Sequence, residues 1–112
     1  MQGTYCRFYV RESERHQGRP LWEWLLTEAN RLGLRGGSAY RAMAGFGRHH
    51  VLAESHFFEL AGNLGVEVEF MASEAEAAAL LEVLERERIH IPFALVPARF
   101  GVVGEDAAGS AP

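Results

Sequence analysis

Hydrophobic and polar residues alternate in two stretches of the chain, one near its start and one past its middle. In the first stretch, residues 5–10, Cys6, Phe8 and Val10 fall on one side and more polar residues on the other. In the second, residues 66–70 read Val-Glu-Val-Glu-Phe and alternate strictly. A period of two is typical of a strand with one buried face, so both stretches predict strands.

Two further stretches carry apolar residues at helical spacing. Pro20 suits the first turn of a helix, apolar residues follow at positions 21, 22, 25, 26, 29 and 32, and Gly33 supplies a C-terminal stop. Trp24 falls on the polar side of this helix, which we interpret as a hint of a subunit contact. The second helix begins with Ser73-Glu74-Ala75-Glu76, the pattern of a capping box, and its apolar stripe continues to Leu84.

Between these elements we expect two more strands and a loop. Residues 38–46 are rich in apolar and small side chains and predict the second strand. Residues 89–103 contain short apolar runs broken by Pro92 and Pro97, as in an edge strand or a bent one. Residues 11–19 are too charged for a core and predict a polar loop.

The resulting order is strand, helix, strand, repeated once, which is the split βαβ arrangement. We therefore expect an α+β fold, a ferredoxin-like sandwich with a four-stranded antiparallel sheet and two helices on one face. The bare face of the sheet then carries Tyr5, Arg7, Tyr9, Glu67 and Glu69. Because adjacent antiparallel strands place side chains opposite one another, Arg7 is expected to pair with one of the glutamates.

The composition is that of an ordinary globular domain. The chain has 112 residues, 48% of them hydrophobic and 23% charged, and we expect one folded domain over residues 1–104 with a flexible tail at 105–112. The formal net charge of −4 argues against a nucleic-acid binder. No apolar run approaches the ~20 residues of a membrane span, and the N-terminus lacks the order of a signal peptide, so we expect a cytoplasmic protein. Cys6 is the single cysteine and is expected to be a buried thiol.

The turn Gly45–His50 is the strongest candidate for chemistry. Its sequence, Gly-Phe-Gly-Arg-His-His, places two glycines around an aromatic residue and follows them with Arg48. Glycines allow a close backbone approach to a ligand or a positive φ, and a guanidinium with nearby backbone N–H groups forms a cradle for an anion. A tight turn with solvated basic side chains is the alternative.

Arg19 and the histidines are secondary candidates. Arg19 adjoins the N-terminus of the first predicted helix, where a guanidinium and the helix end together favour an anion, although capping or plain solvation fits equally well.

His49, His50 and His56 suggest a metal, but adjacent histidines on a strand point to opposite faces, so we expect surface histidines and no metal site. For the charged loop 11–19 we favour a solvated loop or a lid over acid–base catalysis, because no defined partner accompanies its side chains.

Several motifs together resemble the PII-like proteins grouped as domain of unknown function 190. These motifs are Phe8-Tyr9-Val10-Arg11-Glu12, Arg15-His16-Gln17-Gly18-Arg19-Pro20-Leu21, the glycine-rich approach to Arg41, Gly45-Phe46-Gly47 and Phe57-Phe58-Glu59-Leu60. The resemblance extends from Tyr5 to Gly104. It implies a homotrimer without catalytic residues, related in shape to the PII signalling proteins, in which small ligands, often adenine nucleotides, bind in clefts between subunits.

The resemblance also implies which residues contact the ligand. By position these are the base of the loop after the second strand and one residue near the C-terminus: Gly45, Phe46, Gly47, Arg48 and Arg99. The chain departs from PII proteins proper between the last helix and the last strand, where residues 85–90 lack the glycine-lysine phosphate loop. Arg86 or Arg88 is the candidate replacement for the lysine charge.

We therefore expect a regulatory protein, a trimeric sensor that binds an anionic ligand, with an adenine nucleotide as the candidate, and regulates a partner such as a membrane transporter. No catalytic residue, metal or further cofactor is expected. The alternative is a small ferredoxin-like enzyme that acts on an anionic metabolite, with His16 or His49 as base. RNA binding is disfavoured, because Glu67 and Glu69 on the bare sheet face repel phosphates.

Overall fold

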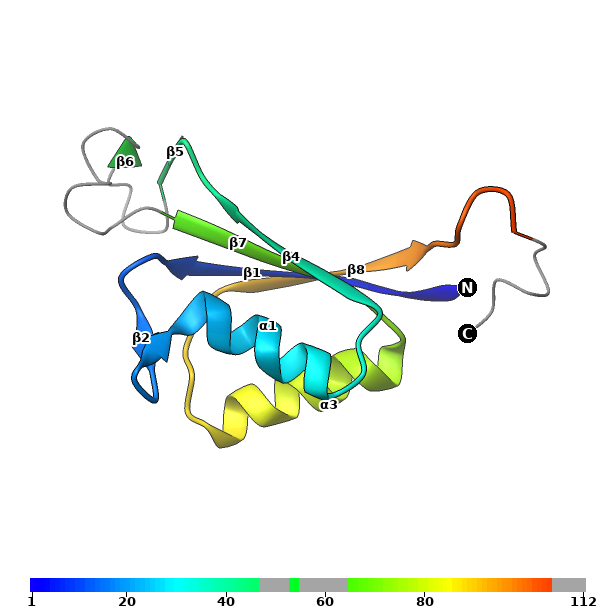
Figure 1. Ribbon diagram of the computed structural model, residues 1–112, viewed down its shortest axis with the longest axis horizontal. Coiled ribbons are helices and arrows are strands. Elements are labelled where there is room, and N and C mark those ends of the chain that lie inside the picture. Colours follow the sequence, from blue (N-terminus) through cyan, green and yellow to red (C-terminus); the bar gives the residue numbers. More distant parts are fainter. Residues whose placement is uncertain (47–52, 55–64, 106–112) are drawn as a thin grey trace.

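A four-stranded antiparallel sheet with two helices on one face forms the part of the chain that the computed structural model describes, residues 1–46, 53–54 and 65–105 (Figure 1). The elements are β1 (Gln2–Arg11), β2 (Arg15–His16), β3 (Arg19–Pro20), α1 (Leu21–Arg31), β4 (Gly36–Arg41), β5 (Ala44–Gly45), β6 (Ala53–Glu54), β7 (Gly65–Ala72), α3 (Glu74–Arg86) and β8 (Phe93–Arg99). The main sheet has the strand order β4-β7-β1-β8. The expected α+β, ferredoxin-like architecture is confirmed.

The central strand β1 is longer than the alternation predicted, because it has a partner on each side. Its residues Thr4–Arg11 pair with β7 and its residues Gln2–Phe8 pair with β8, both antiparallel. Pro97 lies in β8, at the edge of the sheet, as predicted. A proline is tolerated there because an edge strand has only one neighbour to which its backbone donates.

The hydrophobic core lies between the sheet and the helices. Its strand residues are Cys6, Phe8, Val10, Val66, Val68, Phe70 and Ala72, and its helix residues are Leu21, Trp24, Leu25, Ala29, Ala77, Leu80, Val83 and Leu84. Phe8 and Phe70 meet edge to face with 6.1 Å between ring centroids. Cys6 is fully buried, as predicted.

Both helices begin and end close to the predicted signals. The backbone N–H of Glu76 donates to Ser73 Oγ at 3.1 Å, and the backbone N–H of Ser73 donates to Glu76 Oε1 at 2.8 Å, which is the expected capping box. α1 begins directly after Pro20, and Gly33, with φ of 87°, follows its C-cap. Capping satisfies backbone groups that a helix end otherwise leaves without partners.

Trp24 is a correction to the sequence analysis. Its side chain is only 5% exposed, so the expectation of an exposed subunit contact is wrong. The ring of His16 lies edge-on to it, with 4.6 Å between centroids. His16 reaches this position because residues 15–20 form a hairpin of β2 and β3 instead of an open loop. Gln17 and Gly18, with φ of 53° and 78°, supply the positive values that a two-residue type I′ turn requires.

The predicted strand over residues 38–46 is two strands. β4 ends at Arg41, and the backbone N–H of Ala42 still donates to Gly65 at 2.8 Å. After Met43 the chain forms β5, which pairs with β6 and no longer with β7. Gly45 and Phe46, which were predicted to contact a ligand, therefore lie beyond the main sheet.

Candidate ligand-binding site

Gly45 and Phe46 lie where the chain has left the main sheet. Gly45 pairs with Ala53 in the small β5–β6 ladder, and Phe46 follows with 68% of its surface exposed. Gly45 is not left-handed, and a Cβ placed there would meet no atom of the described residues within 4 Å. Neither its backbone conformation nor crowding by the described residues requires this glycine, so close approach to a ligand is the prediction that stays open for it. Gly47 and Arg48 lie outside the described residues.

Arg99 lies at the last position of β8, opposite Gln2. It lines a cavity of about 580 Å³ together with Gln2, Gly3, Glu74, Pro97 and Ala98. The cavity walls offer a guanidinium, a carboxylate and an amide, which suits a polar ligand.

The two predicted halves of the site are at opposite ends of the sheet (Figure 1). Val10 and Arg41 both pair with Val66 at one end, whereas Arg99 pairs with Gln2 at the other, eight positions away along β1. At about 3.3 Å per residue this separation is about 26 Å. One protomer therefore does not bring Arg99 to the base of the loop after β4.

Arg19 lies along the outer surface of α1. Its Nη2 donates to Thr27 Oγ1 at 2.8 Å and lies 3.3 Å from Glu23 Oε1. Two acceptors on the helix thus already satisfy the guanidinium in part. Its role as an anion ligand stays a prediction.

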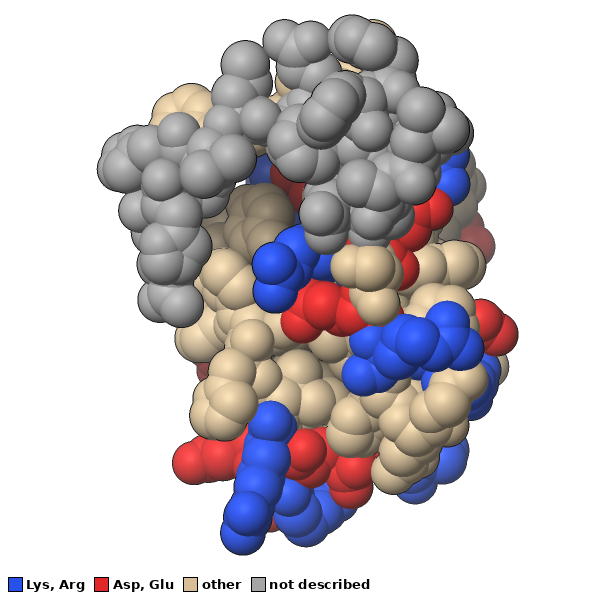
Figure 2. Space-filling model, turned by 90° about the vertical axis from the view of Figure 1, so that its left-hand side faces the viewer, with Lys and Arg blue, Asp and Glu red and all other residues tan. Residues whose placement is uncertain are grey.

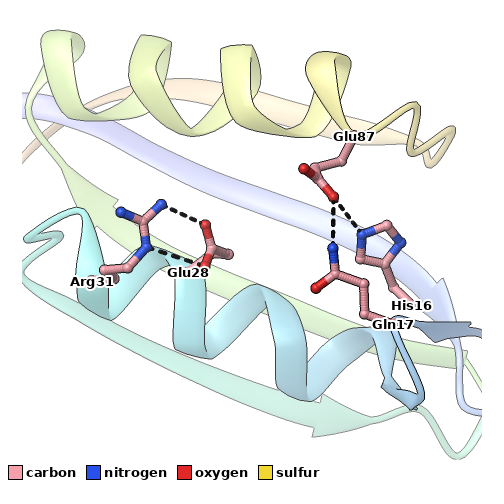
Figure 3. Close-up of polar contacts among 5 residues, drawn as sticks. All are labelled: His16, Gln17, Glu28, Arg31 and Glu87. Carbon is pink, nitrogen blue, oxygen red and sulfur yellow. Dashed lines mark hydrogen bonds and ion pairs between the residues drawn. The ribbon is translucent and has the colours of Figure 1, made fainter.

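The tip of the β2–β3 hairpin contacts the end of α3, a contact that sequence reasoning missed (Figure 3). His16 Nε2 lies 2.9 Å from Glu87 Oε1, and Gln17 Nε2 donates to the same oxygen at 3.1 Å. The residues are about 70 positions apart in the chain, so no local pattern announces their contact. The one available signal was Gln17-Gly18, a glycine-containing pair of the kind that closes two-residue hairpins.

Glu12, which precedes the β2–β3 hairpin, contacts the end of β4. Glu12 Oε1 lies 2.5 Å from Arg41 Nη2, and both residues line a second cavity of about 130 Å³ with Trp22, Ala39 and Val66. Figure 2 looks at this end of the molecule, where arginine and acidic side chains lie next to one another. The described surface at this end carries both positive and negative side chains. An anion would therefore have to bind to individual basic side chains and not to a uniformly positive surface.

The connection after α3 contains an arginine in an uncommon conformation. Arg88 has φ of 59°, its backbone N–H donates to Glu85 at 3.0 Å, and the backbone N–H of Ile89 donates to Leu84 at 3.0 Å. These two bonds form the Schellman motif, in which glycine is the usual left-handed residue. α1 ends in the same way with Gly33 in that position.

The face of the sheet opposite the helices carries an apolar surface around one ion pair. Tyr9, Tyr40, Met71 and Val96 have between 37% and 53% of their surface exposed. Tyr5 lies on the same face, since it pairs in register with Met71 and Val96. The centre is polar, because Arg7 Nη2 lies 3.2 Å from Glu69 Oε1.

Neither a metal cluster nor a membrane-spanning helix is found in the described part of the chain. Its residues contain no group of three or more His, Cys, Asp or Glu side chains arranged to hold a metal ion. His49, His50 and His56, the metal candidates of the sequence, fall outside the described residues. No helix in the described ranges has the length and hydropathy that crossing a membrane requires.

Comparison with known proteins adds a family. The model of the DUF190 family, described as "Uncharacterized ACR, COG1993", matches residues 3–90 of this chain. A UPF0166 protein from Aquifex aeolicus (strain VF5) is 32% identical over 79 residues, which cover 70% of this chain and 75% of the relative.

Two solved structures share the fold. CPII, a nitrogen regulatory PII-like protein from Thiomonas intermedia K12 bound to ADP, AMP and bicarbonate, matches with a TM-score of 0.65 and 14% identity, over 88% of this chain and 87% of CPII. A protein from Thermus thermophilus, assigned to the PII-like signalling proteins, matches with a TM-score of 0.55 and 19% identity, over 87% of this chain and 85% of that one. At these identities the likeness establishes the PII-like fold.

Proposed function

The chain belongs to the DUF190 family, and on this basis and that of its PII-like fold we propose that it is a regulatory protein, a homotrimer that binds an anionic ligand in clefts between its subunits. An adenine nucleotide is the first candidate ligand. The bound state would alter affinity for a partner protein, such as a membrane transporter. This function needs no catalytic residue.

The observation that carries the proposal is the separation of the two predicted ligand-contacting regions. The chain leaves the sheet toward Gly45 and Phe46 at the end where Arg41 and Val10 flank Val66, and Arg99 pairs with Gln2 at the other end, about 26 Å from Val10 along β1. If both regions contact one ligand, they must come from different copies of the chain. A cleft between subunits satisfies this requirement, and Arg48 would join it from the loop that follows Gly45.

The bare face of the sheet supports assembly. Tyr9, Tyr40, Met71 and Val96 form an exposed apolar surface on it. Two of its charged side chains, Arg7 and Glu69, pair with one another, which lowers the cost of burying them against another copy. Closed rotational symmetry covers such a face in every copy without leaving one exposed.

The choice of ligand is supported by the CPII neighbour, which was solved with ADP, AMP and bicarbonate. All three are anions with oxygens that a guanidinium such as Arg99 binds through charge-assisted hydrogen bonds. The enzymatic alternative has less support, because the solved structures that share the fold are described as PII-like regulatory or signalling proteins. Of its two proposed bases, His16 contacts Glu87 and Trp24 of its own protomer, and His49 lies outside the described residues.

Titration calorimetry with ADP, AMP and bicarbonate tests the proposal. We expect at least one of them to bind the wild-type protein, and Arg99→Ala to weaken that binding by about 1.5–3 kcal/mol, the range for a hydrogen bond to a charged group. Arg31→Ala is the matched control, because Arg31 lies on α1 and its side chain contacts Glu28. Equal affinities for wild type and Arg99→Ala would remove Arg99 from the site, and failure of all three anions to bind would contradict the proposed function.

A further inference from the structure

The segment Arg11–Pro20 reaches two loops that are far apart in the sequence. At its tip, His16 and Gln17 contact Glu87, the residue that follows α3 (Figure 3). Glu87 therefore holds the hairpin at the start of the connection between α3 and β8. The edge-on contact between His16 and buried Trp24 packs this tip against α1.

Near its N-terminal end, which we call its root, the segment contacts the start of a different loop. Glu12 contacts Arg41, the last residue of β4, from which the chain departs toward β5. The long connection between β4 and β7 therefore begins at a residue that the segment holds. The segment thus contacts the starting points of two connections at the same end of the sheet.

The root and the tip are joined by short hydrogen bonds around Glu14. The backbone N–H of Arg11 donates to Glu14 Oε1 at 2.7 Å, and the backbone N–H of Glu14 donates to the carbonyl of Arg11 at 3.0 Å. The backbone N–H of Leu21 donates to the carbonyl of Glu14 at 2.8 Å. These bonds close the base of the hairpin and connect Arg11, Glu14 and Leu21.

Unfavourable local geometry gathers at these two contacts. Among the described residues, Gln17 and Arg88 are the non-glycine residues with positive φ, and Glu87 contacts the first and precedes the second. At the other contact, Glu12 Oε2 is buried and has no hydrogen-bond partner among the described residues. Such costs persist only where surrounding contacts impose them.

We propose that the segment Arg11–Pro20 is a bridge that couples the end of α3 to the end of β4. Release of the tip from Glu87 loosens the contact between Glu12 and Arg41, and release of Arg41 loosens the tip by the same free energy, since coupling is reciprocal. The bridge couples the contacts of Glu87 to those of Arg41. It goes beyond the proposed ligand binding, because the coupling exists in the ligand-free protein.

Amide hydrogen exchange of the ligand-free protein tests the bridge. Glu87→Ala removes the acceptor at the tip, and we expect it to raise exchange of the distant Ala42 amide, which donates to Gly65, by about fivefold or more. Arg41→Ala removes the partner at the root, and we expect a similar rise for the Ile89 amide, which donates to Leu84.

Two controls separate coupling from general loss of stability. Glu28→Ala removes a pair of similar chemistry, Glu28–Arg31, that lies within α1, and it should change neither amide (Figure 3). The amides of Cys6 and Val68, in the two central strands, should keep their wild-type exchange in all variants. Two results would overturn the proposal. One is a rise in amide exchange only at the end that carries the substitution, and the other is a rise of equal size in the Cys6 and Val68 amides.

Discussion

Arg7 on β1 and Glu69 on β7 are directly opposite one another in the strand register, and Nη2 of the first lies 3.2 Å from Oε1 of the second. The guanidinium also lies 5.6 Å from the centre of the Tyr5 ring. Hydrogen bonding to the Tyr5 hydroxyl raises the pKa of Arg7 above its usual value. The pairing predicted from alternation is confirmed, and it places an ion pair at the centre of a face that also carries Glu67 and exposed apolar side chains.

This cluster predicts a pH effect on Tyr5. A hydrogen bond to Glu69 raises the pKa of Tyr5 above its usual 10.0. A pKa that is raised by folding contributes stability that is complete below about pH 10 and is lost as the pH rises through the folded-state value. Glu69→Gln should lower the pKa of Tyr5 toward 10.0 and reduce that contribution.

Absorbance titration of the phenolates measures this change, with Tyr5→Phe identifying which of the three tyrosine steps belongs to Tyr5. The prediction is for the Tyr5 step to move to lower pH in Glu69→Gln. A step that stays in place would mean that Glu69 does not act on Tyr5 in solution.

The two Schellman motifs predict opposite effects of substitution. Arg88 adopts φ of 59°, a conformation that costs an L-residue side chain about 1 kcal/mol, and Gly33 adopts φ of 87° without that cost. Arg88→Gly should raise the free energy of unfolding by about 0.5–1 kcal/mol, after allowance for the greater freedom of glycine in the unfolded chain. Gly33→Ala should lower it by about 1 kcal/mol.

Urea denaturation of both variants checks this pair. Destabilisation by Arg88→Gly would show that the arginine side chain contributes more than its backbone conformation costs. That result would point to an interaction of the Arg88 side chain in addition to the backbone bonds that end α3.

Cys6 predicts a thiol that is inert in the folded protein. The side chain is fully buried on the helix side of the sheet, and burial raises its thiol pKa above the usual 9.0. Because the thiolate is the reactive form, alkylation by iodoacetamide at pH 8 should be slower than in denaturant by at least about a hundredfold. Rapid modification without denaturant would contradict the placement of Cys6 in the core.

Local patterns were sufficient for the elements that depend on local physics. Residues 66–70 alternate strictly and lie in β7, and the Ser73–Glu76 capping box begins α3 as predicted. Gly33 ends α1 where the sequence indicated. In each case the determining interactions are made within a few residues, or by one buried face of the element.

Features that depend on contacts between distant residues could not be predicted from the sequence. Trp24 lies off the apolar arc of its helix, and it is buried because His16 covers it from a hairpin that local hydrophobicity does not reveal. The contact of His16 with Glu87 spans 71 positions. The candidate site depends on contacts more distant still, since Gly45 and Arg99 lie at opposite ends of a protomer and their expected convergence between subunits stays a prediction.

The central claim is that copies of this chain assemble through the bare face of the sheet, so that Arg99 of one meets the loop base of another. Light scattering on the wild-type protein at micromolar concentration, coupled to size-exclusion chromatography, tests it most directly. The expected mass is three times that of the 12.4 kDa chain. Tyr40→Glu, which places a charge on the apolar face without touching the core, should shift the mass toward one chain. A wild-type protein with the mass of a single chain would contradict the account.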